Sequence, residues 1–410
     1  MSIVIIGGGP SGLLAALASS EKSDDVVIFN KNPHPGKKIS AVPLEDFYFS
    51  EKLPPKKMAE YFSPKADFVS PIFKSFGYSD LVKLFKKINM DLEADANGHF
   101  KANGMAGVDL CNHLLDALIK RGVTYKKSSR VTDLLIENDR ITGVLVNNSP
   151  FPANTVILAT GSFSSPKYGA TRDGYTISER LGHQINDLKP ALVDLVTHER
   201  YGKILGGLAI DDVKISIFYS NKMVGSEIGQ IRFTPTGISG PIIINHSAEI
   251  ISKLAEEDVE VRLDFMPDQP RETYESWLIQ QFISRSHILV GQFLGRYFSE
   301  NVIKAIELES RVKLDKSVSH ITNLERKSLI HAIKDFRLSI KKAKPFNSTR
   351  GVLGGVAIDD IDPHTMQSRK IQGLFFAGDI IDVLGPYGGF NMQFAFSTGY
   401  IAGKAAAKLN

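Results

Sequence analysis

Four-residue apolar runs and a glycine-rich turn mark the start of the chain. Ile3 to Ile6 and Val26 to Phe29 contain no polar residue, and an alanine- and leucine-rich stretch from Leu13 to Ser20 separates them. Uninterrupted runs of this length are typical of parallel strands that are buried on both faces. The order of strand, glycine turn, helix and strand predicts a βαβ unit.

Two more runs of the same kind lie far down the chain. Val156 to Ala159 ends at Thr160-Gly161, and Leu374 to Ala377 ends at Gly378-Asp379. Gly388-Gly389 then opens a closing helix. The end of the chain therefore repeats the α/β pattern of its start.

The middle of the chain has a different pattern. Val259 to Phe265 alternates strictly between apolar and polar residues, which predicts a half-buried antiparallel strand. Arg271 to Phe336 has helical periodicity, and Thr322 and Glu325 have the spacing of a capping box. We therefore expect an α/β fold in which a split domain is interrupted by a β-barrel-like domain that carries a small helical insertion. The predicted boundaries are 1–188 and 359–410 for the split domain, 189–270 and 337–358 for the barrel, and 271–336 for the insertion.

Composition narrows the class of protein. The chain has 410 residues, of which 43% are hydrophobic and 23% charged, as in ordinary soluble proteins of two to three domains. Its single cysteine, Cys111, excludes an internal disulfide and a multi-thiolate metal site, and it fits a reducing cytoplasm. Helical spacing with Leu110, Leu114 and Leu115 predicts that this thiol is buried in the core.

Charge and hydropathy argue against two classes of partner. The net charge is only +4, and basic pairs such as Lys56-Lys57 and Lys126-Lys127 are scattered, so we expect no nucleic-acid partner. No uncharged apolar run reaches the ~18 residues of a membrane span. The ten histidines are dispersed without metal-ligand spacing, so we expect no metal site. A small-molecule partner remains, and the oligomeric state is left open.

The clearest chemical motif is the turn after the first strand. Gly7, Gly9 and Gly12 have the G-x-G-x-x-G spacing, and Pro10 and Ser11 lie between them. Gly7 permits the tight turn, Gly9 lets backbone N–H groups approach a pyrophosphate, and Gly12 lets the helix pack against the strand. The start of the helix, with its unpaired N–H groups, favours phosphates. This context predicts a dinucleotide site.

One part of the dinucleotide pattern is missing. The second strand normally ends in an acidic residue that binds the ribose hydroxyls, but here Asn30 occupies that position. An amide binds a hydroxyl without the strength of a charged acceptor. We therefore expect weaker binding at the adenosine end, which Asn30→Asp would strengthen.

Several motifs together resemble a known family. They are Gly36-Lys37-Lys38, the run from Ala159 to Lys167, Gly169 to Tyr175, Phe233 to Pro241, Phe375 to Asp379, and Gly385 to Gln393. The chain is similar, nearly end to end, to the HI0933-like (BaiN-type) NAD(P)/FAD-dependent oxidoreductases of bacteria. These belong to the two-dinucleotide-binding-domains flavoprotein superfamily, whose FAD domain is of the glutathione-reductase type. The resemblance implies a split Rossmann-like FAD-binding domain with an inserted β-barrel-like domain.

The resemblance also implies a cofactor and its site. It implies bound FAD, with NAD(P)H as a transient co-substrate, because the sequence contains no second strand–glycine-turn–helix unit for a nicotinamide dinucleotide. Cofactor contacts are expected at the residues of the matched motifs and at the strand start Val131. They are Gly7, Gly9, Pro10, Ser11, Gly12, Asn30, Lys31, Lys38, Val131, Thr160, Gly161, Gly378, Asp379, Gly388, Gly389, Asn391 and Met392. The flavin would carry the chemistry, transferring hydride through its N5 atom to or from a small organic substrate.

The chain departs from the family after the Gly-x-Lys element. The family has a glycine-rich segment with an Arg-Cys-Asn core there, whereas this chain continues as Ile39-Ser40-Ala41-Val42-Pro43-Leu44. No catalytic acid or base can be assigned. Two hypotheses follow: an FAD-dependent oxidoreductase, or a flavin-binding sensor or interaction protein without efficient turnover. A dehydrogenase that uses only NAD is disfavoured by the Gly378-Asp379 strand end and the closing helix.

Overall fold

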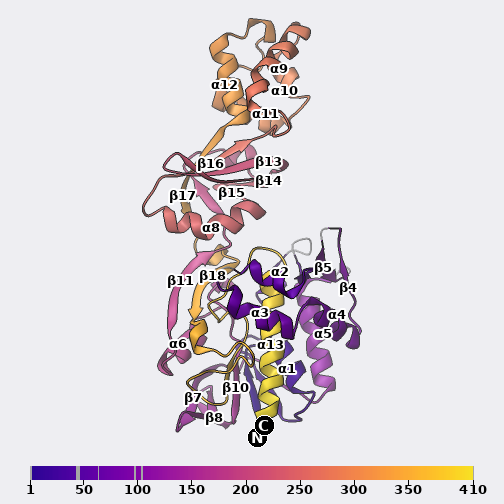
Figure 1. Ribbon diagram of the computed structural model, residues 1–410, viewed down its shortest axis with the longest axis vertical. Helices are drawn as coiled ribbons and strands as arrows, with labels where there is room; N and C mark the ends of the chain where they lie inside the picture. Colours follow the sequence, from indigo (N-terminus) through magenta and orange to yellow (C-terminus); the bar gives the residue numbers. More distant parts are fainter. Residues whose placement is uncertain (1, 43–46, 63, 97, 103–104, 410) are drawn as a thin grey trace. The chain divides into compact units, whose positions relative to one another are not determined.

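The computed structural model describes residues 2–42, 47–62, 64–96, 98–102 and 105–409. These residues form two compact units (Figure 1): unit 1 contains 1–190 and 349–410, and unit 2 contains 191–348. The expected boundaries at 188 and 358 thus fall at 190 and 348. Residues 349–358 lie in unit 1 because β18 (Gly351–Val356) pairs there with β11 (Ile185–Ala191).

A five-stranded sheet forms the centre of unit 1. Its order is β19-β10-β1-β2-β6, with bounds Leu374–Phe376, Thr155–Leu158, Ile3–Ile6, Val26–Phe29 and Thr124–Lys126. All four pairings are parallel. The first four strands are buried along their whole length, as their apolar sequences predict. Parallel pairing brings the carboxyl ends of these strands to one edge of the sheet. The segments that follow them, which begin at Gly7, Asn30, Thr160-Gly161 and Gly378-Asp379, therefore lie at that edge.

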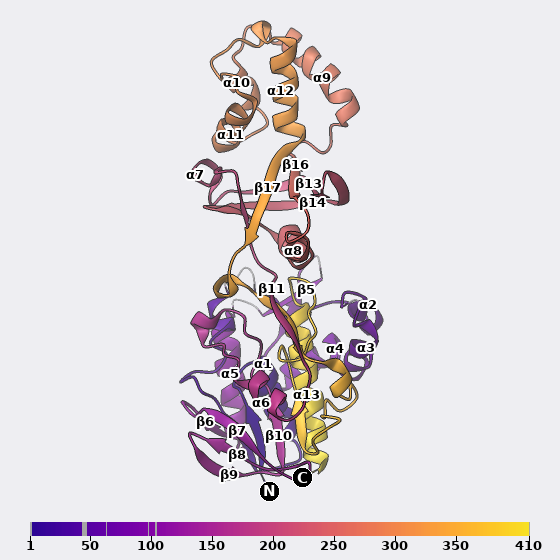
Figure 2. The ribbon, with the colours of Figure 1, turned by 90° about the vertical axis from the view of Figure 1, so that its left-hand side faces the viewer.

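Two helices from opposite ends of the chain pack against each other beside this sheet. Helix α1 is Pro10–Ser19 and helix α13 is Phe390–Leu409. A Cβ at Gly399 would lie 2.2 Å from the Ser11 carbonyl oxygen, and one at Gly403 would lie 2.1 Å from the Ala15 carbonyl oxygen. Figures 1 and 2 show the end of α13 beside the start of β1. Glycine at both positions lets the backbones approach closely enough to join the two halves of unit 1.

The rest of unit 1 surrounds this core. One small sheet has the order β3-β5-β4 (Ser50–Glu51, His99–Ala102, Leu92–Ala94), and another has the order β7-β8-β9 (Val131–Glu137, Arg140–Val146, Ser149–Pro152). The helices are α2 (Pro55–Glu60), α3 (Ala66–Ser75), α4 (Tyr78–Lys87), α5 (Gly107–Lys120) and α6 (Asp173–Arg180). Cys111 on α5 is fully buried, as predicted, and burial raises the pKa of its thiol to about 12.

Unit 2 is a closed six-stranded barrel with a helical insertion. The barrel order is β12-β15-β14-β13-β16-β17 (Leu195–Thr197, Gly237–Ser239, Lys222–Thr234, Ala209–Tyr219, Val259–Asp264, Phe336–Ala343). Strand β16 alternates between buried and partly exposed residues, which confirms its predicted period. Helices α7 (Gly202–Leu205) and α8 (Pro241–Lys253) complete the barrel.

The insertion leaves the barrel after β16 and returns at β17. It contains α9 (Arg271–Ser284), α10 (Val290–Leu294), α11 (Glu300–Ser310) and α12 (Asn323–Lys334). The predicted capping box is present: the Glu325 backbone N–H donates to the Thr322 hydroxyl at 3.2 Å, and the Thr322 N–H donates to the Glu325 carboxylate at 2.9 Å. The expected fold class, a split Rossmann-like domain with an inserted barrel and helical subdomain, is confirmed.

Candidate cofactor site

The glycine turn between β1 and α1 is closed by backbone packing. A Cβ at Gly7 would lie 2.3 Å from the Ala159 carbonyl oxygen, and one at Gly12 would lie 2.0 Å from the Gly7 carbonyl oxygen. Gly7 also has a φ of +117°. Both positions therefore require glycine, for the turn and for the close packing of α1 respectively.

Gly9 differs from its two neighbours in the motif. It is the N-cap of α1 with φ −87° and ψ 179°, which any residue can adopt, and no atom lies within 4 Å of the position of an added Cβ. No side chain caps the helix there. Open space above uncapped helix amides is the arrangement that binds a phosphate. Gly7, Gly9, Pro10, Ser11 and Gly12 thus form a cradle that fits the pyrophosphate of a dinucleotide.

Asn30 directly follows β2, and its side chain hydrogen-bonds to other residues of the protein. Its Nδ2 atom donates to the carbonyl oxygens of Asn32 (3.1 Å) and His34 (3.0 Å) and contacts the Tyr125 hydroxyl at 2.7 Å. Its Oδ1 atom accepts from the Gly8 N–H at 3.4 Å. The side chain is buried and holds the loop after β2 against the glycine turn. This role is structural, and sequence reasoning missed it.

The structure therefore reverses our expectation for Asn30→Asp. A carboxylate cannot donate, so it would lose the hydrogen bonds to the carbonyl oxygens of Asn32 and His34 and place a buried charge against them, at a cost of about 1–3 kcal/mol. We expect the variant to unfold at lower denaturant concentration and to gain no FAD affinity. Asn148→Asp, at an exposed turn position, is the matched control and should unfold like the wild type. Higher FAD affinity with unchanged stability would contradict this interpretation.

Lys31, the residue after Asn30, lies among polar and charged side chains from other parts of unit 1. The Lys31 Nζ atom donates to the Thr171 hydroxyl at 2.5 Å, and burial lowers the pKa of the Lys31 ammonium, with Asp173 opposing the shift. Arg130 donates two hydrogen bonds to Asp173, both at 2.9 Å. Val131 follows Arg130 and is buried at the start of β7. The fold thus brings Lys31 and the Arg130-Val131 strand start to the same end of the site.

The most informative contact joins the two halves of unit 1. Lys38 Nζ donates to Asp379 Oδ2 at 3.0 Å and to the Ser164 hydroxyl at 2.9 Å, and it lies 3.4 Å from the Ser162 hydroxyl. Lys38 and Asp379 are 341 residues apart, and their side chains are each 32% exposed. Gly378 lies against Ser11, since a Cβ at Gly378 would be 2.6 Å from the Ser11 hydroxyl oxygen. The Gly-Asp turn is thus adjacent to the first turn of α1.

Lys38→Met removes the cation from this cluster and leaves the Asp379 carboxylate unbalanced beside the phosphate cradle. We expect FAD affinity to fall about tenfold, which corresponds to ~1.4 kcal/mol. Lys37→Met is the matched control, because Lys37 is the exposed neighbour and should keep wild-type affinity. Titration of the apoprotein with FAD measures both. Equal losses in the two variants would show that general surface charge, not this cluster, supports binding.

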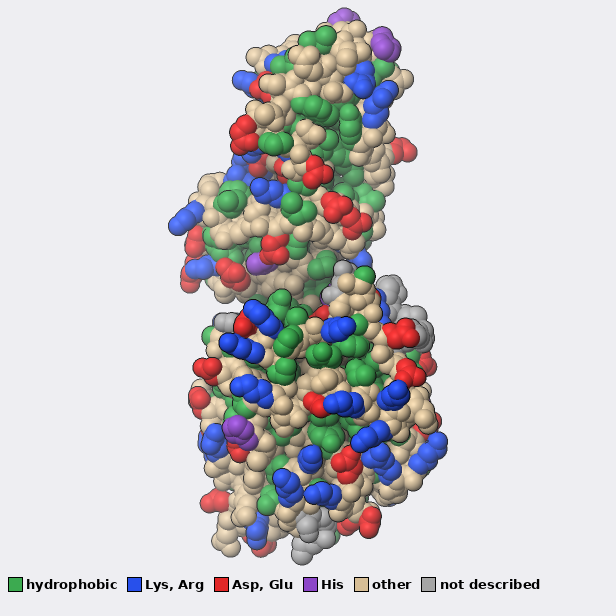
Figure 3. Space-filling model, turned by 45° about the vertical axis from the view of Figure 1, so that its right-hand side comes forward, with side chains coloured by type: hydrophobic (Ala, Val, Ile, Leu, Met, Phe, Trp, Pro, Cys, Tyr) green, Lys and Arg blue, Asp and Glu red, His purple; other side chains and the backbone are tan. Residues whose placement is uncertain are grey.

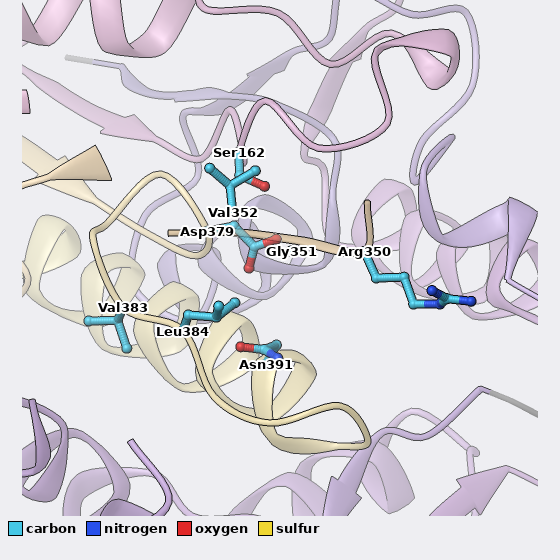
Figure 4. A pocket seen from close by; sticks show the side chains of 8 residues that line it. All are labelled: Ser162, Arg350, Gly351, Val352, Asp379, Val383, Leu384 and Asn391. Carbon is cyan, nitrogen blue, oxygen red and sulfur yellow. The ribbon is translucent and has the colours of Figure 1, made fainter. Parts of the chain in front are cut away.

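A pocket connects this cluster to the start of α13. Figure 4 shows Ser162, Asp379 and Asn391 around it, with Val383 and Leu384 on an aliphatic side and Arg350 at one edge. The Asn391 side chain holds the preceding loop: its Nδ2 donates to the carbonyl oxygens of Gly385 (2.9 Å) and Pro386 (3.0 Å). Met392 packs partly buried against the core.

The remaining predicted residues line the same region or close it. Thr160 and Gly161 lie just beyond the end of β10, which pairs with β1, and no atom lies within 4 Å of a Cβ added at Gly161. Gly389 is tightly enclosed, since a Cβ there would lie 2.5 Å from the Ser50 carbonyl carbon. Its N–H donates to Glu51 Oε1 at 2.9 Å. The preceding residue Gly388 has a φ of +127°.

Sequence reasoning did not select four residues of this region: Ser162, Ser164, Glu51 and Arg350. The two serines carried a usable signal, because they directly follow the Thr160-Gly161 turn at alternate positions. Glu51 lies in a two-residue strand and Arg350 at the return from unit 2, where no pattern distinguishes them.

Three further observations concern surface charge, metal-binding groups and membrane-crossing helices. On the face in Figure 3, Lys and Arg side chains are interspersed with Asp and Glu and form no continuous basic stripe. Within the described part of the chain, no group of three or more His, Cys, Asp or Glu side chains is placed to hold a metal ion. No helix in that part combines the length and apolar character that crossing a membrane requires.

Comparisons with known proteins agree with the motifs. The family model described as HI0933-like protein Rossmann domain matches residues 1–405. A 3-dehydro-bile acid delta(4,6)-reductase of Clostridium scindens is 27% identical, covering 99% of both chains, and a ribosomal RNA dihydrouridine synthase of Escherichia coli is 24% identical, covering 97% of this chain and 96% of the relative.

A solved structure shares the fold across the whole chain. The 3-ketosteroid-delta4-(5alpha)-dehydrogenase of Rhodococcus jostii is similar with a TM-score of 0.52 and 15% identity, covering 99% of this chain and 96% of that one. The sequence motifs, the family model and the fold give one result. The chain belongs to the HI0933-like family of Rossmann-fold proteins, a family of FAD-dependent oxidoreductases.

Proposed function

We propose that this protein is an FAD-dependent reductase that delivers hydride to a carbon–carbon double bond conjugated to a carbonyl group in a small organic substrate. The observation that carries the proposal is the set of groups at one sheet edge. The open phosphate cradle at Gly9, the Lys38–Asp379 pair and the pocket beside α13 follow one another there.

Each part of this edge has a separate task in binding. The amides at the start of α1 would hold the pyrophosphate, and the Asp379 carboxylate would accept hydrogen bonds from hydroxyl groups of the cofactor's ribityl chain. Lys38 balances the carboxylate and fixes its orientation through the two serine hydroxyls. The aliphatic residues Val383 and Leu384 exclude water from one side of the pocket. The bound flavin supplies the hydride and accepts electrons from a nicotinamide.

The substrate class comes from the chemistry that the two curated relatives share. Their names describe reduction of an unsaturated 3-dehydro bile acid and formation of dihydrouridine. In each case the double bond that is lost is conjugated to a carbonyl group, which takes up the negative charge when hydride adds to the far carbon. We extend this reaction to the present chain, with NAD(P)H as the reductant that binds transiently.

The test is spectroscopic first and catalytic second. We expect the purified protein to bind FAD with the absorption of an oxidised flavin, to bleach with NADH or NADPH under anaerobic conditions, and to reoxidise with a 4-en-3-one steroid or a 4,6-dien-3-one bile acid. A saturated 3-oxo steroid is the control and should leave the flavin reduced. Protein that binds no FAD refutes the cofactor. Reduced flavin that reoxidises only with ribosomal RNA refutes the small substrate, and flavin inert to every reductant supports the sensor hypothesis.

A further inference from the structure

A buried carboxylate from β3, that of Glu51, lies at the start of α13, and none of the comparisons assigns it a role. Glu51 is 4% exposed, and both of its oxygens are engaged. Oε1 accepts from the Gly389 N–H at 2.9 Å, and Oε2 lies 2.5 Å from His99 Nδ1. An ionised carboxylate only accepts hydrogen bonds, so the His99 ring donates its Nδ1 proton to it.

Backbone packing holds the carboxylate in this place. Strand β3 lies against the helix start, since a Cβ at Gly389 would be 2.5 to 2.6 Å from three backbone atoms of Ser50. His99 comes from the adjacent strand β5, whose register pairs it with Glu51. The centroid of the His99 ring lies 5.0 Å from the centroid of the Tyr48 ring. Glu51 is thus held by two strands against the helix end.

A negative charge at this position cancels part of the field of the helix. The N-terminus of a helix carries about half a positive charge, which favours anions close to it. A pyrophosphate held at Gly9 and a ribityl chain held at Asp379 would direct the ring system of FAD toward the pocket that Asn391 of α13 lines. The reduced ring is an anion, so the helix end alone would stabilise the reduced state.

We infer that Glu51 tunes the bound flavin: its carboxylate neutralises the start of α13 and thereby disfavours anionic forms of the cofactor, while the hydrogen bond from His99 moderates that charge. This inference rests on the proposed function. Glu51 acts through the helix end and is a positioning residue. A flavin with a lower reduction potential is a stronger hydride donor, as reduction of a conjugated double bond requires.

Two variants with opposite expected signs test the inference. Glu51→Gln keeps the shape and the acceptor for the Gly389 N–H but removes the charge, so the midpoint potential should become more positive. Sulfite, which forms an anionic adduct with oxidised flavin, should bind about 5- to 30-fold more tightly, as expected for one charge at a partly buried helix end. His99→Phe keeps an aromatic ring but removes the hydrogen bond to Glu51, so the carboxylate charge is no longer moderated. Sulfite should then bind more weakly, and the midpoint potential should fall.

General damage to the site would move both variants in the same direction, which would overturn the inference. Unchanged potential and sulfite affinity in Glu51→Gln, with wild-type FAD content, would also overturn it while leaving the proposed function intact. Failure of the wild-type protein to bind FAD would refute both. Thermal unfolding of each holoprotein shows whether the fold is preserved.

Discussion

Gly9→Asp is expected to abolish FAD binding while leaving the protein at least as stable as the wild type. The backbone at Gly9 suits any residue, and no atom obstructs a side chain there. Aspartate is a favoured N-cap, so its carboxylate would take the amide groups at the start of α1 and stabilise the helix by a few tenths of a kcal/mol relative to glycine. The same carboxylate would face the pyrophosphate.

The size of the effect follows from like charges in contact. Two unit charges about 4 Å apart near a protein surface repel by ~4 kcal/mol, so FAD affinity should fall by about 1,000-fold. Flavin content after purification and titration of the apoprotein measure the loss. Gly225→Asp on β14 is the matched control, because that glycine also has open space around it and lies in unit 2. Wild-type flavin content in Gly9→Asp would show that the dinucleotide does not approach α1.

Gly403→Val should separate α1 from α13 and destabilise unit 1. The added Cβ would lie 2.1 Å from the Ala15 carbonyl oxygen, which is backbone and cannot move aside. Overpacking of this kind costs about 3 kcal/mol. For a unit of this size we expect the Tm to fall by about 6–12 °C. Calorimetry of the apoprotein measures the shift without interference from bound cofactor.

Two references make this measurement specific. Ala407→Val places the same side chain on a partly exposed position of the same helix and should cost only about 0.5 kcal/mol, through helix propensity. Trp277, the single tryptophan of the chain, lies on α9 in unit 2, so its fluorescence follows the other unit. A Gly403→Val protein with an unchanged Tm would mean that the close contact between α1 and α13 does not hold the two halves together.

The sequence predicts the centre of unit 1 because its signals are local. Buried parallel strands produce uninterrupted apolar runs, and the turn at Gly7 needs a residue without a side chain. The capping box at Thr322 is equally local, since both partners lie within one helical turn. These features depend on neighbours in the chain, and sequence spacing is enough to find them.

The polar contacts of the site depend on residues that are distant in sequence. Asn30 occupies the expected place at the end of β2, but its partner Tyr125 is 95 residues away and turns its amide inward. Lys38 meets Asp379 across the whole inserted unit. Glu51 reaches the start of α13 from a strand of only two residues, which is too short to show any period. No periodicity marks such partners, so only the folded structure identifies them.

The pairing of α1 with α13 has a consequence for biosynthesis. Helix α1 and its glycine turn are translated before unit 2, whereas α13, which packs against α1, is translated after it. The phosphate cradle therefore lacks this packing partner until the whole of unit 2 has been synthesised. Chains that stop before α13 would then take up no flavin and would be open to proteolysis.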